Sequence, residues 1–433
     1  QFYNWYEDNT YLATTTTPEY TSNFPVGSHT MKVVLDNCLS LSESNITFNA
    51  RNVYPTSLPA ATGGLIHILS AGAFPHATTD EYVQDGLVVH YDGIDNQNLG
   101  DTNHSSDAVV WKDLSDNGYD VTLRVGHSGT SRGDATNAAS VAECANSAWE
   151  DNGFLLGGYC YFAKVPADPT AANALSDIMP NLPFDNDNYT IESVFNMSKL
   201  TSPRGGFVGW GKQSTVNESN SLGFLWANNS INPTTPSFRH FWWTNDIDVR
   251  FTDANANSIK NIAITYDNDA SASPNNRIFY YNGTTTSIEY IGNHCDDPLT
   301  YNCRNKTNKN TARCGSFYIG LAVANNTNDE CVPAANGAVH YSRGNKIFSI
   351  RIYNKTLSSD EILANYKVDK LRFAATPIVK IGPKQCTNVV VHSDRLITCQ
   401  APAGTSGTTV NVEVISAEDS SRILLLENEF KYQ

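Results

Sequence analysis

The sequence predicts an all-β protein with three parts: an extended N-terminal segment, a large sandwich and a smaller C-terminal sandwich. Short apolar runs, many of them alternating at period two, recur between turns rich in Gly, Asn, Asp and Pro. One late segment, 356–373, carries a helical pattern. Of the 433 residues, 17% are charged and 11% are aromatic, a balance that favours a sandwich-rich extracellular protein over a cytosolic helical enzyme.

The N-terminal region, residues 1–85, is predicted to be extended. Two runs alternate as strands do, 29–36 and 45–54, and a third apolar run covers 63–72. The region has too little apolar mass to form an independent domain. Thr14 to Thr17 precede Pro18, which indicates either O-linked sugar or a stiff polar linker, and the linker is the favoured interpretation.

Residues 86–373 predict a large β-sandwich or jelly roll, because strand-like runs follow one another at regular spacing. In the helix that ends this region, Ser358 and Glu361 have the spacing of a capping box. The runs that carry the prediction include 86–93, 120–125, 189–197, 205–211, 259–267, 277–283, 315–322 and 346–354.

Two stretches resemble known families. The segments 86–96, 108–123, 189–195 and 346–373 resemble the laminin-G-like, concanavalin A-like jelly rolls of secreted and cell-surface proteins. Residues 376–433 resemble an IPT/TIG domain, an immunoglobulin-like sandwich, whose later strands match 379–386, 395–404, 409–416 and 428–432. That family's usual first strands, with a Gly-Gly-Thr turn, are not found before 376. The resemblance therefore implies a partial C-terminal domain with an open edge.

Charge and motifs favour an extracellular glycoprotein. The net charge of −15 disfavours nucleic acid and anionic membrane as partners. No run approaches the ~20 apolar residues of a bilayer span, and Gln1 is interpreted as a processed N-terminus. N-linked glycans are predicted at the Asn-x-Ser/Thr positions Asn45, Asn103, Asn188, Asn196, Asn217, Asn228, Asn282, Asn305, Asn325 and Asn354.

Nine cysteines, none of them at zinc spacing, favour disulfides over a metal site. The local pairs expected are Cys144–Cys160, Cys295–Cys303, Cys314–Cys331 and Cys386–Cys399, although connectivity among the middle four stays open. Cys38 is left over, either free or bonded to another chain.

Motifs for chemistry are weak. Trp242, Trp243, Asp246 and Asp248 form the best sugar-binding or glycosidase-like group, but an exposed strand face is the favoured interpretation. Asp92, Asp95 and Asp101, with nearby asparagines, offer the hard oxygen ligands that calcium prefers. A solvated loop without calcium is the favoured interpretation of these residues. No other cofactor is expected, and no enzyme activity.

The predicted function is a structural extracellular glycoprotein that assembles with itself, head to tail, into filaments. Residues 1–60, with the strands 29–36 and 45–54, are expected to complete the C-terminal domain of a neighbouring copy, although completion within one chain stays open. The spare Cys38 would then lock the two copies together. The alternative is a cell-surface carbohydrate-binding adhesin, with a glycoside hydrolase as a distant third.

Overall fold

The structure is a computed structural model that places most of the chain. It describes residues 2–7, 10–15, 27–36, 41–50, 53–54, 57–58, 62–69, 77–100, 104–125, 144, 147–150, 152–199, 201–202, 204–212, 218–225, 237–242, 245–251, 259–269, 276–290, 310–324, 338–374, 377–393, 396–416 and 423–433. Up to residue 58 the description covers the backbone.

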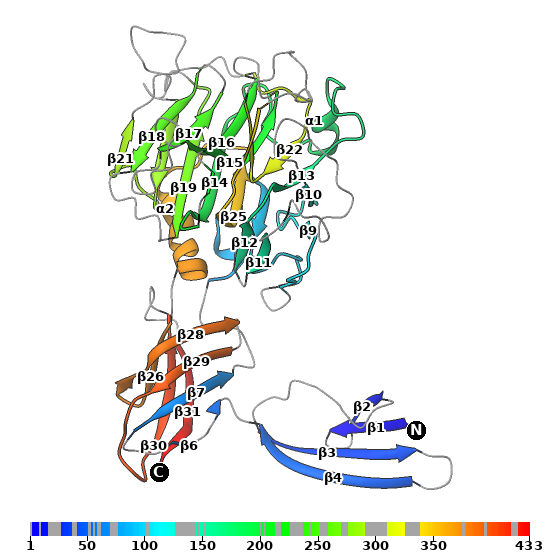
Figure 1. The fold of residues 1–433 in the computed structure, drawn as a ribbon, viewed down its shortest axis with the longest axis vertical. Helices are drawn as coiled ribbons and strands as arrows, with labels where there is room; N and C mark the ends of the chain where they lie inside the picture. The colour runs from blue at the N-terminus through cyan, green and yellow to red at the C-terminus, as the bar shows by residue number, and fades with distance from the viewer. Residues whose placement is uncertain are drawn as a thin grey trace. The chain divides into compact units, whose positions relative to one another are not determined.

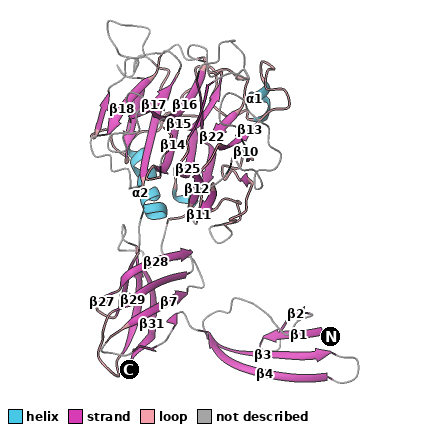
Figure 2. Ribbon diagram, in the orientation of Figure 1, coloured by secondary structure: helices cyan, strands magenta, loops and turns pink. Residues whose placement is uncertain are grey.

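The predicted all-β class is confirmed, as Figures 1 and 2 show. The chain divides into two compact units instead of three consecutive regions. One unit is the jelly roll, residues 77–374, and the other joins residues 1–76 to 375–433. In the part of the chain that the structure describes, no helix is long and apolar enough to cross a bilayer.

The jelly roll has two large antiparallel sheets. The nine-stranded sheet has the order β21 (Ile288–Tyr290), β18 (Ile247–Phe251), β17 (Ser237–Phe241), β16 (Ser219–Leu225), β15 (Arg204–Gly211), β22 (Phe317–Ile319), β13 (Cys160–Lys164), β10 (Val121–Val125) and β9 (Val110–Trp111). The seven-stranded sheet has the order β11 (Ala148–Glu150), β12 (Gly153–Leu156), β25 (Asn345–Tyr353), β14 (Tyr189–Asn196), β19 (Lys260–Tyr266) and β20 (Arg277–Tyr281), with β8 (Leu87–Asp92) also paired to β25.

Smaller elements complete this unit. They are the strand pair β23 (Leu321–Ala324) and β24 (Ala338–Tyr341), the helix α1 (Ala174–Ile178), the short helix η1 (Thr79–Glu81), the helix α2 (Ser359–Asp369) and the π-helical turn η6 (Lys370–Ala374). The predicted capping box is confirmed, because Ser358 caps α2 and exchanges hydrogen bonds with Glu361.

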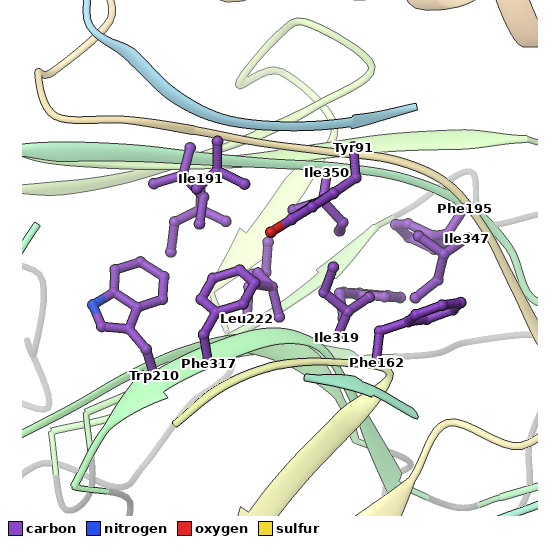
Figure 3. Packing of buried hydrophobic residues seen from close by; sticks show 14 of the residues in the cluster. Tyr91, Phe162, Ile191, Phe195, Trp210, Leu222, Phe317, Ile319, Ile347 and Ile350 are labelled. Atoms are coloured by element: carbon purple, nitrogen blue, oxygen red, sulfur yellow. The ribbon is translucent and has the colours of Figure 1, made fainter. Parts of the chain in front are cut away.

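Apolar side chains from both sheets fill the space between them (Figure 3). Ile191 and Ile350 come from the seven-stranded sheet and face Trp210 and Phe317 from the nine-stranded sheet, all four being fully buried. Each side chain of this kind stabilises the fold by about 1.5–3 kcal/mol when it leaves water. The sequence pattern of alternating apolar residues therefore maps onto one continuous core.

A buried ionic network fastens α2 to the outer face of the seven-stranded sheet. The guanidinium of Arg351 binds Glu192 at 2.8 Å and Asp369, the last residue of α2, at 2.8 Å. Burial disfavours the charged guanidinium, but these two carboxylates outweigh it and raise the pKa of Arg351. The network fixes the end of the jelly roll at the point where the chain leaves this unit.

The second unit contains the immunoglobulin-like sandwich, and its missing strands are present. Its five-stranded sheet has the order β27 (Lys384–Gln385), β26 (Ile378–Ile381), β30 (Thr409–Ile415), β31 (Ile423–Tyr432) and β6 (Ser57–Leu58). Its four-stranded sheet has the order β28 (Thr387–Ser393), β29 (Leu396–Ala401), β7 (Gly64–Leu69) and β5 (Val53–Tyr54). In Figure 1 the blue strand β7 accordingly lies among orange and red strands.

Strand β7 supplies a central part of this sandwich. It pairs with β29 over six residues, from Leu69 opposite Leu396 to Gly64 opposite Ala401. Ile66 and Ile68 are fully buried in a core shared with Val379, Val412 and Phe430. The jelly roll is therefore inserted between β7 and β26 of one immunoglobulin-like domain.

This pairing corrects two expectations. The strand that completes the domain is 64–69, instead of the predicted strands 29–36 and 45–54. Of those two predicted strands, only Val53 and Tyr54 take part in the domain, as strand β5. It also pairs within one chain, so the expectation that a neighbour supplies it is wrong for these strands. The physical reason is register: alternate residues of β7 are apolar and enter the core, while Leu65 points outward.

A separate four-stranded sheet occupies residues 2–50. Its order is β2 (Thr10–Thr15), β1 (Phe2–Glu7), β3 (Gly27–Asp36) and β4 (Leu41–Ala50). The predicted strand 29–36 lies in β3, and it pairs with β4 along ten positions. Among the described strands, this sheet pairs only with itself, so β2 and β4 are its edges.

The cysteines agree in part with expectation. Cys144 and Cys160 form the predicted disulfide, and Cys314 is also disulfide-bonded. Cys386 and Cys399 come together in the core as predicted, but as two buried thiols instead of a disulfide. The hydrogen bond between the two thiols, together with burial, raises the pKa of Cys399. Cys38, Cys295, Cys303 and Cys331 lie outside the described residues.

Candidate functional site: an open sheet edge

The strand β31 forms a long edge of the immunoglobulin-like domain. On its inner side it pairs with β30, from Thr409 opposite Lys431 to Ile415 opposite Ile423. On its outer side the described pairing is with β6, and it covers only Lys431 and Tyr432. Of the ten residues of β31, eight therefore present an edge that no described strand covers.

The start of this edge is apolar and uncharged. Residues 423–426 read Ile-Leu-Leu-Leu, and the first charge is Glu427. Ile423 and Leu425 are 49% and 45% exposed, whereas Leu426 is buried in the core. Exposed edge strands are usually protected by charges, prolines or bulges. The edge formed by residues 423–426, called here the β31 edge, contains no charge and no proline, although Arg422 precedes it in sequence and a register irregularity follows it at residues 427–429.

The turn that leads into β7 explains why the strand fits there. Gly63 has a φ of +63°, and a Cβ at this position would lie 2.1 Å from the carbonyl oxygen of Ala401. Only glycine allows so close an approach of two backbones. Thr62-Gly63-Gly64 is thus the signal that marks the start of β7, and the sequence interpretation missed it because it lies about 310 residues earlier in the chain than β26.

The predicted sugar-binding group is an internal ion-pair network. Asp246 and Asp248 are almost fully buried, and Arg239 on the neighbouring strand β17 binds Asp248 at 2.6 Å and Asp246 at 3.2 Å. Burial raises the pKa of Asp246. The expected exposed strand face is wrong, and so is the sugar contact at these carboxylates, because both are occupied by Arg239. Trp243 lies outside the described residues.

Trp242 is likewise part of the interior. Its indole nitrogen donates to the hydroxyl of Tyr189 at 2.9 Å, and the guanidinium of Arg277 stacks on its ring with 3.7 Å to the ring centroid. Burial lowers the pKa of Arg277 to about 10. This stack is worth about 2 kcal/mol when desolvated, and we interpret it as structural.

The residues predicted to bind calcium instead form hydrogen bonds and an ion pair that hold the loop after β8. The buried carboxylate of Asp92 binds Arg372 at 2.9 and 3.1 Å, and it also accepts backbone N–H groups of the following loop. Asp95 accepts from the backbone of Leu99 and Gly100, both at 3.0 Å. Within the described ranges, no three His, Cys, Asp or Glu side chains are grouped to hold a metal ion. Asp101 lies outside those ranges.

The glycan acceptors that the structure describes differ in exposure. Asn354 is exposed directly after β25, and Asn196 is half-buried at the end of β14. The side-chain nitrogen of Asn188 donates to Asp267 at 3.4 Å, and the side-chain oxygen of Asn282 accepts from the backbone N–H of Asn261. For Asn45 the backbone in β4 is described, and Asn103, Asn217, Asn228, Asn305 and Asn325 lie outside the described residues.

Comparison with solved structures returns β-rich proteins at low similarity. The sialidase of Trypanosoma rangeli shares 15% identity and a TM-score of 0.37, covering 66% of this chain and 33% of the sialidase. A botulinum neurotoxin type C structure shares 11% identity and a TM-score of 0.37, covering 71% of this chain and 57% of the toxin chain. The chain spans between a third and about three fifths of these proteins, and none of the curated proteins matches it. Likeness at this level adds no argument about function.

Comparison with protein families identifies the C-terminal part. Residues 371–432 match the IPT/TIG domain. The match begins in η6 and ends at the last residue of β31, so it covers the later strands of the immunoglobulin-like sandwich, to which β5, β6 and β7 add the remainder. The chain therefore carries a jelly roll inserted into an IPT/TIG domain.

Proposed function

We propose that this chain is an extracellular structural glycoprotein whose copies join head to tail through the β31 edge. The observation that carries the proposal is the uncharged and partly exposed start of β31, which no described strand covers. The Cys144–Cys160 disulfide and the many glycan acceptors support an oxidising, extracellular setting.

The partner we propose is the strand β4 of a second copy. β4 is ten residues long, as is β31, and among the described strands it pairs on one side only, with β3. Adding an edge strand to an open sheet is a common mode of protein association. This refines the expected role of the N-terminal region: its strands near β7 complete the domain of the same chain, and its outer sheet reaches the next copy.

The energies are compatible with a specific contact. A strand added along residues 423–426, before the irregularity at 427–429, forms about four backbone hydrogen bonds, each contributing ~0.5–1.5 kcal/mol net. Association costs ~4–15 kcal/mol in lost freedom, so these hydrogen bonds alone do not balance this cost. Burial of apolar side chains such as Ile423 and Leu425, worth about 25 cal/mol per Å² of apolar surface, is therefore needed as well.

Such a contact is heterologous, because β4 and β31 are different surfaces of the chain. Heterologous contacts generate open filaments unless the rotation between copies closes a ring. Cys38 lies in sequence between β3 and β4 and would be available to fix the contact covalently.

The test places a charge on the edge. Leu425→Lys should keep the fold, because the side chain is 45% exposed, and should abolish assembly measured by light scattering and negative-stain microscopy. Leu65→Lys is the matched control: Leu65 is 55% exposed but lies in β7, a strand with a described partner on each side. Assembly of the Leu425→Lys protein to wild-type size would refute the proposal.

A cell-surface carbohydrate-binding adhesin is the second candidate, favoured by a pocket on the jelly roll whose mixed polar and apolar lining includes Lys199 and Lys346. Particles that stay monodisperse and bind a glycan array would support it against the assembly proposal. Both candidates are binding functions, and we propose that the chain has no enzyme activity.

A further inference from the structure

A pocket of about 240 Å³ opens on the outer face of the seven-stranded sheet. Three neighbouring strands form its floor through one row of side chains: Leu155 of β12 is opposite Lys346 of β25, which is opposite Asn196 of β14. Pockets for drug-sized ligands measure ~300–1,000 Å³. The space therefore suits a group about the size of one sugar ring.

The walls of the pocket are apolar on one side. Leu155, Ile259 and Phe348 line it, and Phe348 belongs to a small cluster with Val194 and Phe373 that covers this part of the sheet. Leu155 and Ile259 are half-buried and offer apolar surface to the carbon face of a sugar ring, whereas Phe348 is only 3% exposed and has the Lys346 ammonium over its ring.

The other walls carry a fixed charge network. The Nζ atom of Lys346 binds Glu150 at 2.7 Å and Asn152 at 2.7 Å, and Lys199 binds Glu150 at 3.3 Å. Partial burial opposes ionisation of Glu150, but the hydrogen bonds from the two lysines outweigh it and lower its pKa. The pocket thus offers ammonium donors and carboxylate and amide acceptors in set positions, which suits hydroxyl and acetamide groups.

One residue of the lining is itself a glycan acceptor. Asn196 begins the motif Asn196-Met197-Ser198, and its side-chain oxygen accepts the backbone N–H of Ser198 at 2.8 Å. This bond orients the carboxamide. A sugar attached to Asn196 would therefore start within the lining of the pocket.

We propose that the pocket holds the first N-acetylhexosamine of a glycan attached to Asn196, so that this glycan is packed on the protein while the one at Asn354 extends into solvent. The inference rests on the proposed glycoprotein character of the chain. It adds a binding site for a sugar of the chain's own N-linked glycan. The packed sugar would cover the half-buried side chains of Leu155 and Ile259 and leave the lysine–glutamate network in place.

The test uses the full chain made in a glycosylating eukaryotic host. Peptide mass spectrometry gives the occupancy of Asn196 and Asn354, and an amidase that releases N-linked glycans is then applied to the folded protein. We expect release at Asn196 to be at least tenfold slower than at Asn354, and the two rates to become equal after denaturation.

Variants separate the pocket from the acceptor. Lys199→Ala changes a side chain that is mostly exposed, and it should speed release at Asn196 without changing release at Asn354. Ser198→Ala removes the acceptor motif and should lower the melting temperature, whereas Asn354→Gln should not.

Two results would overturn the inference: an unoccupied Asn196 in a protein whose Asn354 is occupied, or equal release rates at both sites in the folded protein. Absence of sugar at every acceptor would overturn the glycoprotein proposal as well, so the two failures are distinguishable.

Discussion

The insertion of the jelly roll into one immunoglobulin-like domain predicts that a residue near position 66 controls the stability of strands near position 400. Ile66 is fully buried and lies opposite Cys399 across the β7–β29 pairing. The change Ile66→Ala removes buried methyl groups and leaves a cavity, which costs ~2–5 kcal/mol for Ile-to-Ala changes in cores.

The assay is amide hydrogen exchange followed by mass spectrometry, because it reports the opening of each part separately. Since 1.4 kcal/mol corresponds to a tenfold change, exchange in β29 and β30 should accelerate by about 30- to 4,000-fold. Peptides from β25 in the jelly roll serve as an internal reference and should not change.

The matched control is Leu65→Ala on the same strand. Leu65 is 55% exposed, and exposed changes stay within about ±0.5 kcal/mol. Unchanged exchange in β29 of the Ile66→Ala protein would refute the pairing of β7 with β29.

Four further predictions follow from the structure. Arg351→Met should destabilise the jelly roll by ~3–5 kcal/mol in thermal or denaturant unfolding, because it leaves Glu192 and Asp369 buried without their cation; a loss under 1 kcal/mol would contradict the network. Deletion of residues 1–50 should give monomers whose β29 exchanges as in the full chain, since β5, β6 and β7 remain; polymers of this variant would contradict the role of β4. No polysaccharide hydrolysis is expected, and activity that disappears in Asp246→Asn would show that these acids act as catalysts and not only as partners of Arg239. At least half of the ten acceptor asparagines should carry sugar by mass spectrometry of native protein, and a lower fraction would contradict the surface-coat interpretation.

Elements that depend on residues close together in the chain could be predicted reliably from the sequence. The helix α2 was predicted with its capping box because Ser358 and Glu361 are three residues apart, and the strands of the jelly roll followed from alternation. Both signals depend on neighbours in the chain, which a sequence displays directly.

Pairings across long separations were not visible in the same way. The apolar run 63–72 was recognised, but nothing within it indicates that its partner is β29. The partial signal was Gly63, whose φ of 63° belongs to the turn that brings its backbone close to that of Ala401.

The predicted sugar-binding group at Asp246 and Asp248 was misread for a related reason. Asp248 looked exposed because charged residues usually are, yet Arg239 lies directly opposite on β17. The two residues stand at mirrored positions around the turn between β17 and β18, and this hairpin symmetry was the signal for an ion pair.

The most direct test of the proposed assembly is a density map of the native assembled protein that resolves individual strands. The account predicts filaments in which a strand of residues 41–50 from one copy lies beside Ile423–Leu426 of the next, with β7 of each copy still paired to its own β29. Filaments in which the β31 edge is bare, or a native protein that is monomeric throughout, would contradict it.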